Sequence, residues 1–316
     1  MADVHLTRTQ AEALIQPEIS REIIKDIPEQ SAALKLMRRL PNMSTKTRVM
    51  PVLSQTPMAG FVNGDTGLKP TSTAAWENKN IVAEEIAVIV PIPEAVLDDS
   101  QYDIFGEIRP LIAQAFGQVI DGAIFFNVNK PETWPTGIVT DAVAKLKKTV
   151  LGTGVDIAAD VDALMALIEA QGLDVNGFAG DVSVKSKLRG LRDNTNALLF
   201  QPSLTAGTPS TLYGQPLEFI KNGSWDATKA LMIGGDWSQA VYAIRQDLTY
   251  KILDQAVITD ATGKVLLNLA QQDAVALRVV MRLGWQIANP IRPLSGKDDA
   301  NRYPFAVLEP AAPSVP

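Results

Sequence analysis

Residues 103–127 read DIFGEIRPLIAQAFGQVIDGAIFFN, and they decide how the rest of the 316-residue chain must be arranged. Apolar side chains recur here in steps of three and four, which places them on one face of an α-helix. The spacing predicts a helix of roughly six turns with a broad apolar face. Pro110 is expected to bend this helix or to mark where its regular part begins. A helix with so wide an apolar face needs other elements to cover it.

The sequence before this helix is rich in β-forming residues. Residues 47–53 and 81–90 have the composition of strands, with β-branched residues clustered near the end of the second. A long stretch rich in Gly, Pro, Thr, Ser and Asn separates them, and a loop of that length is generally functional or mobile. We therefore expect a long hairpin that projects from the body, with turns at Asn63-Gly64 and Thr66-Gly67.

The sequence after the long helix predicts a compact body of mixed helices and strands. An amphipathic helix is expected over residues 160–171, ended by Gly172 in a left-handed conformation. Strands are expected at 178–184, 215–220, 230–235, 240–246, 248–253, 274–289 and 305–308, with a helical segment at 183–193. The first 50 residues are polar and predict an extended arm with helical pieces, one of them beginning at Thr7 and ended by Pro17.

Composition excludes several classes of function. The chain has no cysteine and one histidine, His5, so a Ser-His-Asp triad and a multi-histidine or thiolate metal site are not expected. Neither G-x-x-x-x-G-K-[ST] nor G-x-G-x-x-G occurs. The net charge of −6 is unfavourable for tight, sequence-specific DNA binding. No catalytic, cofactor-binding or metal-binding residue is therefore assigned, and no cofactor is expected.

Carboxylate pairs leave one catalytic alternative open. Asp98-Asp99, Asp160/Asp162 and Asp298-Asp299 could hold a divalent metal or act as a glycosidase pair. Helix caps for the first two pairs and a solvated loop for the third are the simpler interpretations. No run approaches the roughly 20 apolar residues of a membrane span, and the N-terminus lacks the pattern of a secretory signal. The protein is thus expected to be used in the cytoplasm, or in something assembled there, without a membrane.

The order of these elements resembles the major capsid proteins of tailed bacteriophages with the HK97-type fold. The stretch IIKDIPEQSAALKLMRRLPNMSTKTRVMPVLSQ (residues 23–55) is similar to the N-arm and the first strand of the E-loop of that family. The stretch from Ala75 to Phe126 is similar to the returning E-loop strand, a short helix and the spine helix. TLYGQPLEFI and LMIGGDWSQAVYAIRQDLTYKI resemble A-domain segments, and RVVMRLGWQIANP and YPFAVLEP resemble terminal strands of the P-domain.

This resemblance implies an α+β fold with five parts. Residues 1–46 would be the N-terminal arm, 47–91 the E-loop, 92–137 the P-domain with its spine helix, 138–279 the α/β A-domain, and 280–316 the terminal P-domain strands and tail. It also implies a structural protein that self-assembles through pentamers and hexamers into an icosahedral shell. That shell would enclose double-stranded DNA without sequence-specific contacts. A separate scaffolding protein and a portal are further possible partners, and the host bacterial cytoplasm is the expected place of assembly. The segment 292–302 is longer than the family pattern leads us to expect.

Two other functions stay open at this point. Encapsulin nanocompartments share the fold, and an encapsulin would load a cargo enzyme whereas a virion protein would not. A carboxylate- and Mg²⁺-dependent hydrolase is the third possibility, and it would depend on Asp160 or Asp162.

Charge and position in the expected arm and hairpin suggest which residues meet a neighbouring copy. Residues 1–50 carry a net charge of +2 and residues 51–100 a net charge of −5, so opposite signs could help the arm to align with E-loop segments. The candidate inter-subunit contacts are Arg38, Arg39, Lys69, Trp76, Glu77, Glu84 and Glu85. Trp76 is expected at the root of the hairpin as an apolar anchor, and Arg38 and Arg39 are expected to contact carboxylates of the 77–99 segment. Some relatives join an E-loop lysine to an asparagine of the next subunit. Lys69 and Asn289 do not match that pattern residue by residue, so we expect no covalent cross-link.

Overall fold

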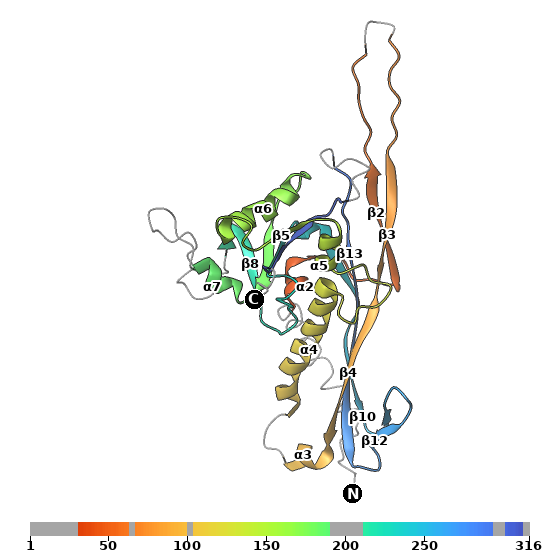
Figure 1. The fold of residues 1–316 in the computed structure, drawn as a ribbon. Helices are drawn as coiled ribbons and strands as arrows, with labels where there is room; N and C mark the ends of the chain where they lie inside the picture. The colour runs from red at the N-terminus through yellow and green to blue at the C-terminus, as the bar shows by residue number, and fades with distance from the viewer. Residues whose placement is uncertain (1–30, 63–66, 100–103, 190–210, 293–300, 312–316) are drawn as a thin grey trace.

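A computed structural model describes residues 31–62, 67–99, 104–189, 211–292 and 301–311. Figure 1 shows a body of helices and two larger sheets, from which a two-stranded hairpin extends at one end. A second, shorter hairpin lies at the opposite end of the molecule. The expected arm helix at Thr7 and the turns at Asn63-Gly64 and Thr66 lie outside the described residues.

A four-stranded sheet and one long helix form the elongated half of the body. The strand order is β1 (Arg38–Arg39), β10 (Ala240–Leu253), β13 (Ala274–Ile287), β4 (Glu84–Pro93). β10 and β13 are 14 residues long each and antiparallel, and β4 is antiparallel to β13. The helix α4 (Ile104–Phe126) is the one that the sequence predicted, and it continues through Pro110 near its N-terminal end. Its buried residues belong to the same core as the inward residues of β10 and β13.

A six-stranded sheet forms the other half. Its order is β5 (Lys148–Val150), β14 (Phe305–Glu309), β9 (Met232–Gly235), β6 (Gly177–Asp181), β8 (Gln215–Ile220), β7 (Thr211–Leu212). Side chains alternate between its faces, as in any strand. Phe305 and Val307 enter the core that contains α4 and α5 (Ile138–Ala144). Ala306 and Leu308 enter a second core with α6 (Ile157–Glu169) and α7 (Val184–Arg189).

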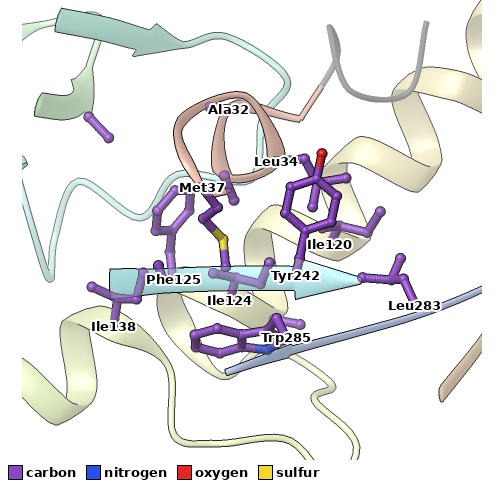
Figure 2. Close-up of a cluster of buried hydrophobic side chains, with 14 of the residues drawn as sticks. Ala32, Leu34, Met37, Ile120, Ile124, Phe125, Ile138, Tyr242, Leu283 and Trp285 are labelled. Atoms are coloured by element: carbon purple, nitrogen blue, oxygen red, sulfur yellow. The ribbon is translucent and has the colours of Figure 1, made fainter. Parts of the chain in front are cut away.

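The core containing α4 is continuous between the two sheets. Figure 2 shows Ile120, Ile124 and Phe125 of α4 beside Tyr242 of β10 and Trp285 of β13. The short helix α2 (Ala32–Leu36) covers this core, and its residues Ala32, Leu34 and the following Met37 are all buried. The first described segment of the chain is therefore part of the body and not a free extension.

Two hairpins lie outside that core. β2 (Thr47–Gln55) is antiparallel to β3 (Ala75–Val82), and β11 (Val257–Thr259) is antiparallel to β12 (Val265–Asn268). Two short helical segments complete the described structure, α3 (Glu94–Asp99) and the 3₁₀ turn η1 (Trp237–Gln239).

The structure corrects several predicted boundaries. The strand expected at 81–90 is two strands, because the chain passes at Ala83 from the hairpin into the four-stranded sheet. The strands expected at 240–246 and 248–253 are the single strand β10. Its pairing with β13 shifts register between Ile244 and Thr249, where the sequence suggested a break. The helix expected from Asp160 begins at Ile157, since Asp156 is its N-cap and accepts a hydrogen bond from the Ala159 amide at 2.9 Å. The hairpin β11–β12 was not predicted.

The sheets also divide the chain differently from the expected domains. The expected boundary between residues 279 and 280 falls inside β13. β10 was expected in the A-domain but pairs with the spine-helix sheet, whereas β14 was expected with the P-domain strands but lies in the six-stranded sheet. In both cases the strand partner lies far away in sequence and leaves no local pattern, so sheet membership could not be predicted from the segment itself.

Where the chain passes from β3 to β4, the Val82 backbone lies against Gly284 of β13. Substitution of this glycine should therefore destabilise the fold. A Cβ at Gly284 would lie 2.5 Å from the Val82 carbonyl oxygen and 2.8 Å from its carbon. Backbone atoms cannot rotate away, so Gly284→Ala should lower the free energy of unfolding by about 1–3 kcal/mol, measured by urea denaturation of unassembled protein. Gly122→Ala in α4 is the matched control, because its Cβ would make an ordinary 3.5 Å contact with Val128. Equal effects of the two substitutions would contradict the argument.

Candidate assembly surface

The hairpin β2–β3 has one face toward the body and one toward solvent. Directly paired residues share a face of a two-stranded sheet. The pairs Arg48–Ile81, Met50–Lys79 and Val52–Glu77 lie on one face, where Val52 and Ile81 are buried. The opposite face, which we call the hairpin face, consists mainly of exposed residues: Val49, Pro51, Trp76, Asn78 and Asn80. It has apolar side chains accompanied by uncharged polar ones, the composition typical of a protein contact surface.

Hydrogen bonds between the hairpin and the body fix the direction of the hairpin. The Lys79 ammonium donates to the Ile287 carbonyl at 3.1 Å, and burial lowers the pKa of this lysine against the opposing effect of Glu77. The Trp134 indole N–H donates to the Val82 carbonyl at 3.1 Å, and the Ile291 amide to the Leu53 carbonyl at 3.0 Å. An isolated two-stranded hairpin is only marginally stable in water, so these contacts hold its paired strands to the body from Val82 at the root to Leu53 near the other end.

Large apolar side chains are exposed along the hairpin and its described tip. Trp76 is 66% exposed, and Met58, Phe61 and Leu68 are more exposed still. Of the other four tryptophans, Trp134, Trp237 and Trp285 are buried and Trp225 is partly buried. Trp76 was expected at the root of the hairpin, but it pairs with Leu53 at the end farthest from the root pair of Thr47 and Val82. Sequence reasoning missed Phe61 and Leu68, although large apolar residues inside a Gly- and Pro-rich loop are a usable signal.

Two of the candidate carboxylates already have partners within the chain. Glu84 accepts a hydrogen bond from the Thr133 hydroxyl at 2.9 Å and lies 3.5 Å from the Lys46 ammonium. Glu85 accepts from the Arg282 Nε at 2.8 Å across the β4–β13 pair. Both side chains therefore help to order the strand that leads out of the hairpin. Glu77 is exposed on the hairpin, opposite Val52.

The candidate cations lie elsewhere on the surface. Arg38 and Arg39 form the exposed edge strand β1, parallel to β10, and Arg39 donates to the Asn42 side-chain oxygen at 3.2 Å. Within the described residues, no ion pair joins either arginine to a carboxylate of residues 77–97. Lys69 is exposed near the hairpin tip, whereas Asn289 is buried and donates its amide to the Arg302 carbonyl at 2.9 Å. The structure thus does not bring Lys69 and Asn289 together in one chain.

The Asp160/Asp162 pair does not form a catalytic pair or a helix cap. Asp160 is buried and its two oxygens accept hydrogen bonds from the Gly152 and Gly154 amides, each at 2.7 Å. Asp162 is exposed, and residues two apart on a helix do not face each other. In the described part of the chain, no three His, Cys, Asp or Glu side chains are grouped so that they could hold a metal ion. Asp298-Asp299 and the side chains of Asp98-Asp99 lie outside the described residues.

The described residues also include no helix that is both long and apolar enough to cross a membrane.

Comparisons with known proteins agree on one family. The model of the phage capsid family matches residues 11–294. The major capsid protein of Staphylococcus phage 80alpha is 27% identical over 277 residues, which are 86% of this chain and 81% of that protein. A solved chain from Microbacterium phage Oxtober96 is 40% identical, with a TM-score of 0.78 over 89% of this chain and 91% of that one. A chain from Mycobacterium phage Cain is 30% identical, with a TM-score of 0.78 over 89% and 90%.

The Glu85–Arg282 contact predicts a small, coupled effect on stability. Both side chains are partly exposed, so Glu85→Gln and Arg282→Gln should each lower the free energy of unfolding by about 1 kcal/mol or less. The double substitution should cost no more than the larger single one, because the pair is lost only once. Urea denaturation of the three variants measures this coupling. Fully additive losses would show that the two side chains do not interact in solution.

Proposed function

Because this chain belongs to the phage capsid family and is a structural protein of the capsid shell with the HK97-type fold, we propose that the hairpin face is the main surface by which its copies join. Self-assembly into a shell follows from the family. The finer proposal is that copies form pentamers and hexamers of a closed icosahedral shell, and that each hairpin lies over a neighbouring copy.

The exposed apolar residues of the hairpin carry this proposal. A single chain leaves Trp76, Phe61 and Leu68 in water although its core is otherwise well filled. Several large apolar side chains exposed along one projecting element are typical of a protein–protein contact. The hydrogen bonds of Lys79 and Trp134 to backbone carbonyls orient the hairpin before any partner binds, and a preoriented surface loses less conformational entropy on association.

The remaining parts of the proposal follow the family resemblance. Of the expected arm 1–46, only the residues before α2 are proposed as the arm, because α2 packs on the core and β1 pairs in the four-stranded sheet. Of the expected E-loop 47–91, the hairpin β2–β3 with its connecting segment is proposed as the E-loop, because β4 lies in the four-stranded sheet. The helix α4 with that sheet is proposed as the P-domain, and the six-stranded sheet with α6 and α7 as the A-domain. We assign no catalytic role to the chain, which is consistent with the engagement of Asp160 by two backbone amides. The shell would enclose double-stranded DNA without sequence-specific contacts, an interpretation that the net charge of −6 supports. Assembly in the host bacterial cytoplasm, with a portal and a separate scaffolding protein as partners, belongs to the same proposal.

Electron microscopy of the purified protein with and without the Trp76→Ala substitution tests the hairpin face. The wild type should form closed shells. Trp76→Ala should raise the protein concentration needed for half-maximal assembly by about tenfold or more, because aromatic anchors dominate the energy of protein contacts. The free energy of unfolding of the unassembled chain should change little, since Trp76 is mostly exposed.

Substitution of the buried Trp285 is the comparison for substitution of the exposed Trp76. Trp285→Ala should lower the free energy of unfolding of the unassembled chain by about 3–5 kcal/mol. Particles of only one or two wild-type copies would overturn the proposed function, and shells that load a cargo enzyme would favour an encapsulin. Unchanged assembly of Trp76→Ala would remove Trp76 from the contact surface.

A second prediction concerns the exposed arginines of β1. We propose that Arg38 and Arg39 contact carboxylates of the 77–99 segment on a neighbouring copy. Reversing both to Glu should promote disassembly most at low ionic strength, because the Debye length falls from about 10 Å at 0.1 M salt to about 3 Å at 1 M. The matched control reverses Lys187 and Arg189, which are exposed on α7 and give the same change in net charge. Disassembly that is unchanged, or equal at every salt concentration, would show that the contact is not electrostatic.

A further inference from the structure

One buried carboxylate joins three separate segments of the chain. Asp121 lies in α4 and is fully buried. Its Oδ1 accepts hydrogen bonds from the Ser31 hydroxyl at 2.6 Å and the Ala33 amide at 3.1 Å. Its Oδ2 accepts from the Ala32 amide at 3.1 Å and the Asn222 side-chain amide at 2.7 Å. The carboxylate thus links the start of α2, the long helix and the segment after β8.

Burying a carboxylate costs free energy that its hydrogen bonds only offset, so stability alone does not explain this arrangement. Burial raises the pKa of Asp121, and the hydrogen bonds from Ser31, Ala33, Asn222 and Ala32 oppose that rise. A buried charge lowers stability unless its hydrogen bonds are satisfied, and an apolar side chain of similar size is often at least as stabilising. What a buried carboxylate adds is a single allowed geometry for the groups that donate to it. Here those groups are mainly the first residues of α2.

The helix α2 depends on this geometry. It has five residues, far fewer than an isolated helix needs to be stable in water. The first amides of a helix have no partner within the helix. Ser31 satisfies the Leu34 amide at 3.2 Å, and Asp121 satisfies the amides of Ala32 and Ala33. On its exposed side, the Lys35 ammonium pairs with Glu218 at 2.8 Å.

We propose that Asp121 is a positioning residue for shell assembly. It fixes the point and the direction at which residues 1–30 join the body, so that the arm meets the neighbouring copy in one register. This inference rests on the proposed function, since it takes those residues as an inter-subunit arm. The carboxylate acts through α2 and touches no neighbouring copy in this role.

The test substitutes Asp121→Asn in the full chain. The amide keeps one acceptor oxygen, and it places an NH₂ group against the donors that faced the other oxygen. Hydrogen exchange of the amides of Ala32 and Ala33 should rise about tenfold or more, while that of β9 stays as in the wild type. The concentration for half-maximal assembly, measured by electron microscopy, should also rise about tenfold, since one lost buried hydrogen bond is of that order.

Asp160→Asn is the matched control, because Asp160 is equally buried and also accepts from backbone amides, those of Gly152 and Gly154. It should speed exchange at those glycines, leave α2 protected and leave assembly unchanged at equal loss of stability. Ser31→Ala, which alters no residue of α4, should show a smaller effect of the same kind as Asp121→Asn and covers the case in which Asp121→Asn does not fold.

Three results would overturn the inference. The first is wild-type assembly of Asp121→Asn, and the second is unchanged exchange at Ala32 and Ala33. The third is an equal loss of assembly in Asp160→Asn, which would indicate a merely structural role. In all three cases wild-type shells leave the proposed function intact, whereas a wild type that forms no shells overturns both.

Discussion

The apolar face of α4 must be covered from two directions, and the arrangement of the other elements follows from this requirement. Phe116, Ile120 and Ile124 are all buried in a core that takes inward side chains from both sheets. Phe125 lies edge-on to Trp225 and Trp237, with ring centroids 5.4 and 6.2 Å away. Elements that share a close-packed core cannot shift independently, so the two sheets and α2 keep fixed positions relative to α4. The hairpin β2–β3 is outside this core and is therefore free to serve another surface.

What the sequence could predict depended on whether the signal was local. The period of residues 104–126 is local, and α4 was predicted to within one residue at each end. The run of apolar and β-branched residues along 274–287 is local too, and β13 was predicted as a strand. Sheet membership is not local, because β14 pairs with β9, whose sequence lies some seventy residues earlier. The break at Ala83 is also a matter of distant partners, since β3 pairs with β2 before it and β4 pairs with β13 after it.

The candidate site was predicted less well than the fold, also for physical reasons. Exposed apolar residues such as Trp76 can be guessed from their position in a hairpin, and the carboxylates Glu84 and Glu85 from charge alone. Their partners within the chain, Thr133 and Arg282, could not be guessed. The role of Asp121 was missed, although its spacing of three and four from Ile124 and Phe125 places it on the apolar face of α4. A carboxylate on such a face signals buried donors elsewhere in the chain.

The residues that form the fold and those proposed to form the shell are largely different sets, and this separation has a physical reason. A residue such as Trp285 is buried before assembly begins, so its burial stabilises every copy equally and cannot favour a contact. Only side chains that a single copy leaves in water, such as Trp76, gain from association. A shell repeats each contact many times, so each one can be weak and still hold, and weak contacts let misplaced copies dissociate and rebind. The proposed hairpin contact meets this demand, because the Lys79 ammonium and the Val82 carbonyl of the hairpin are hydrogen-bonded to the body while its exposed apolar side chains are not covered.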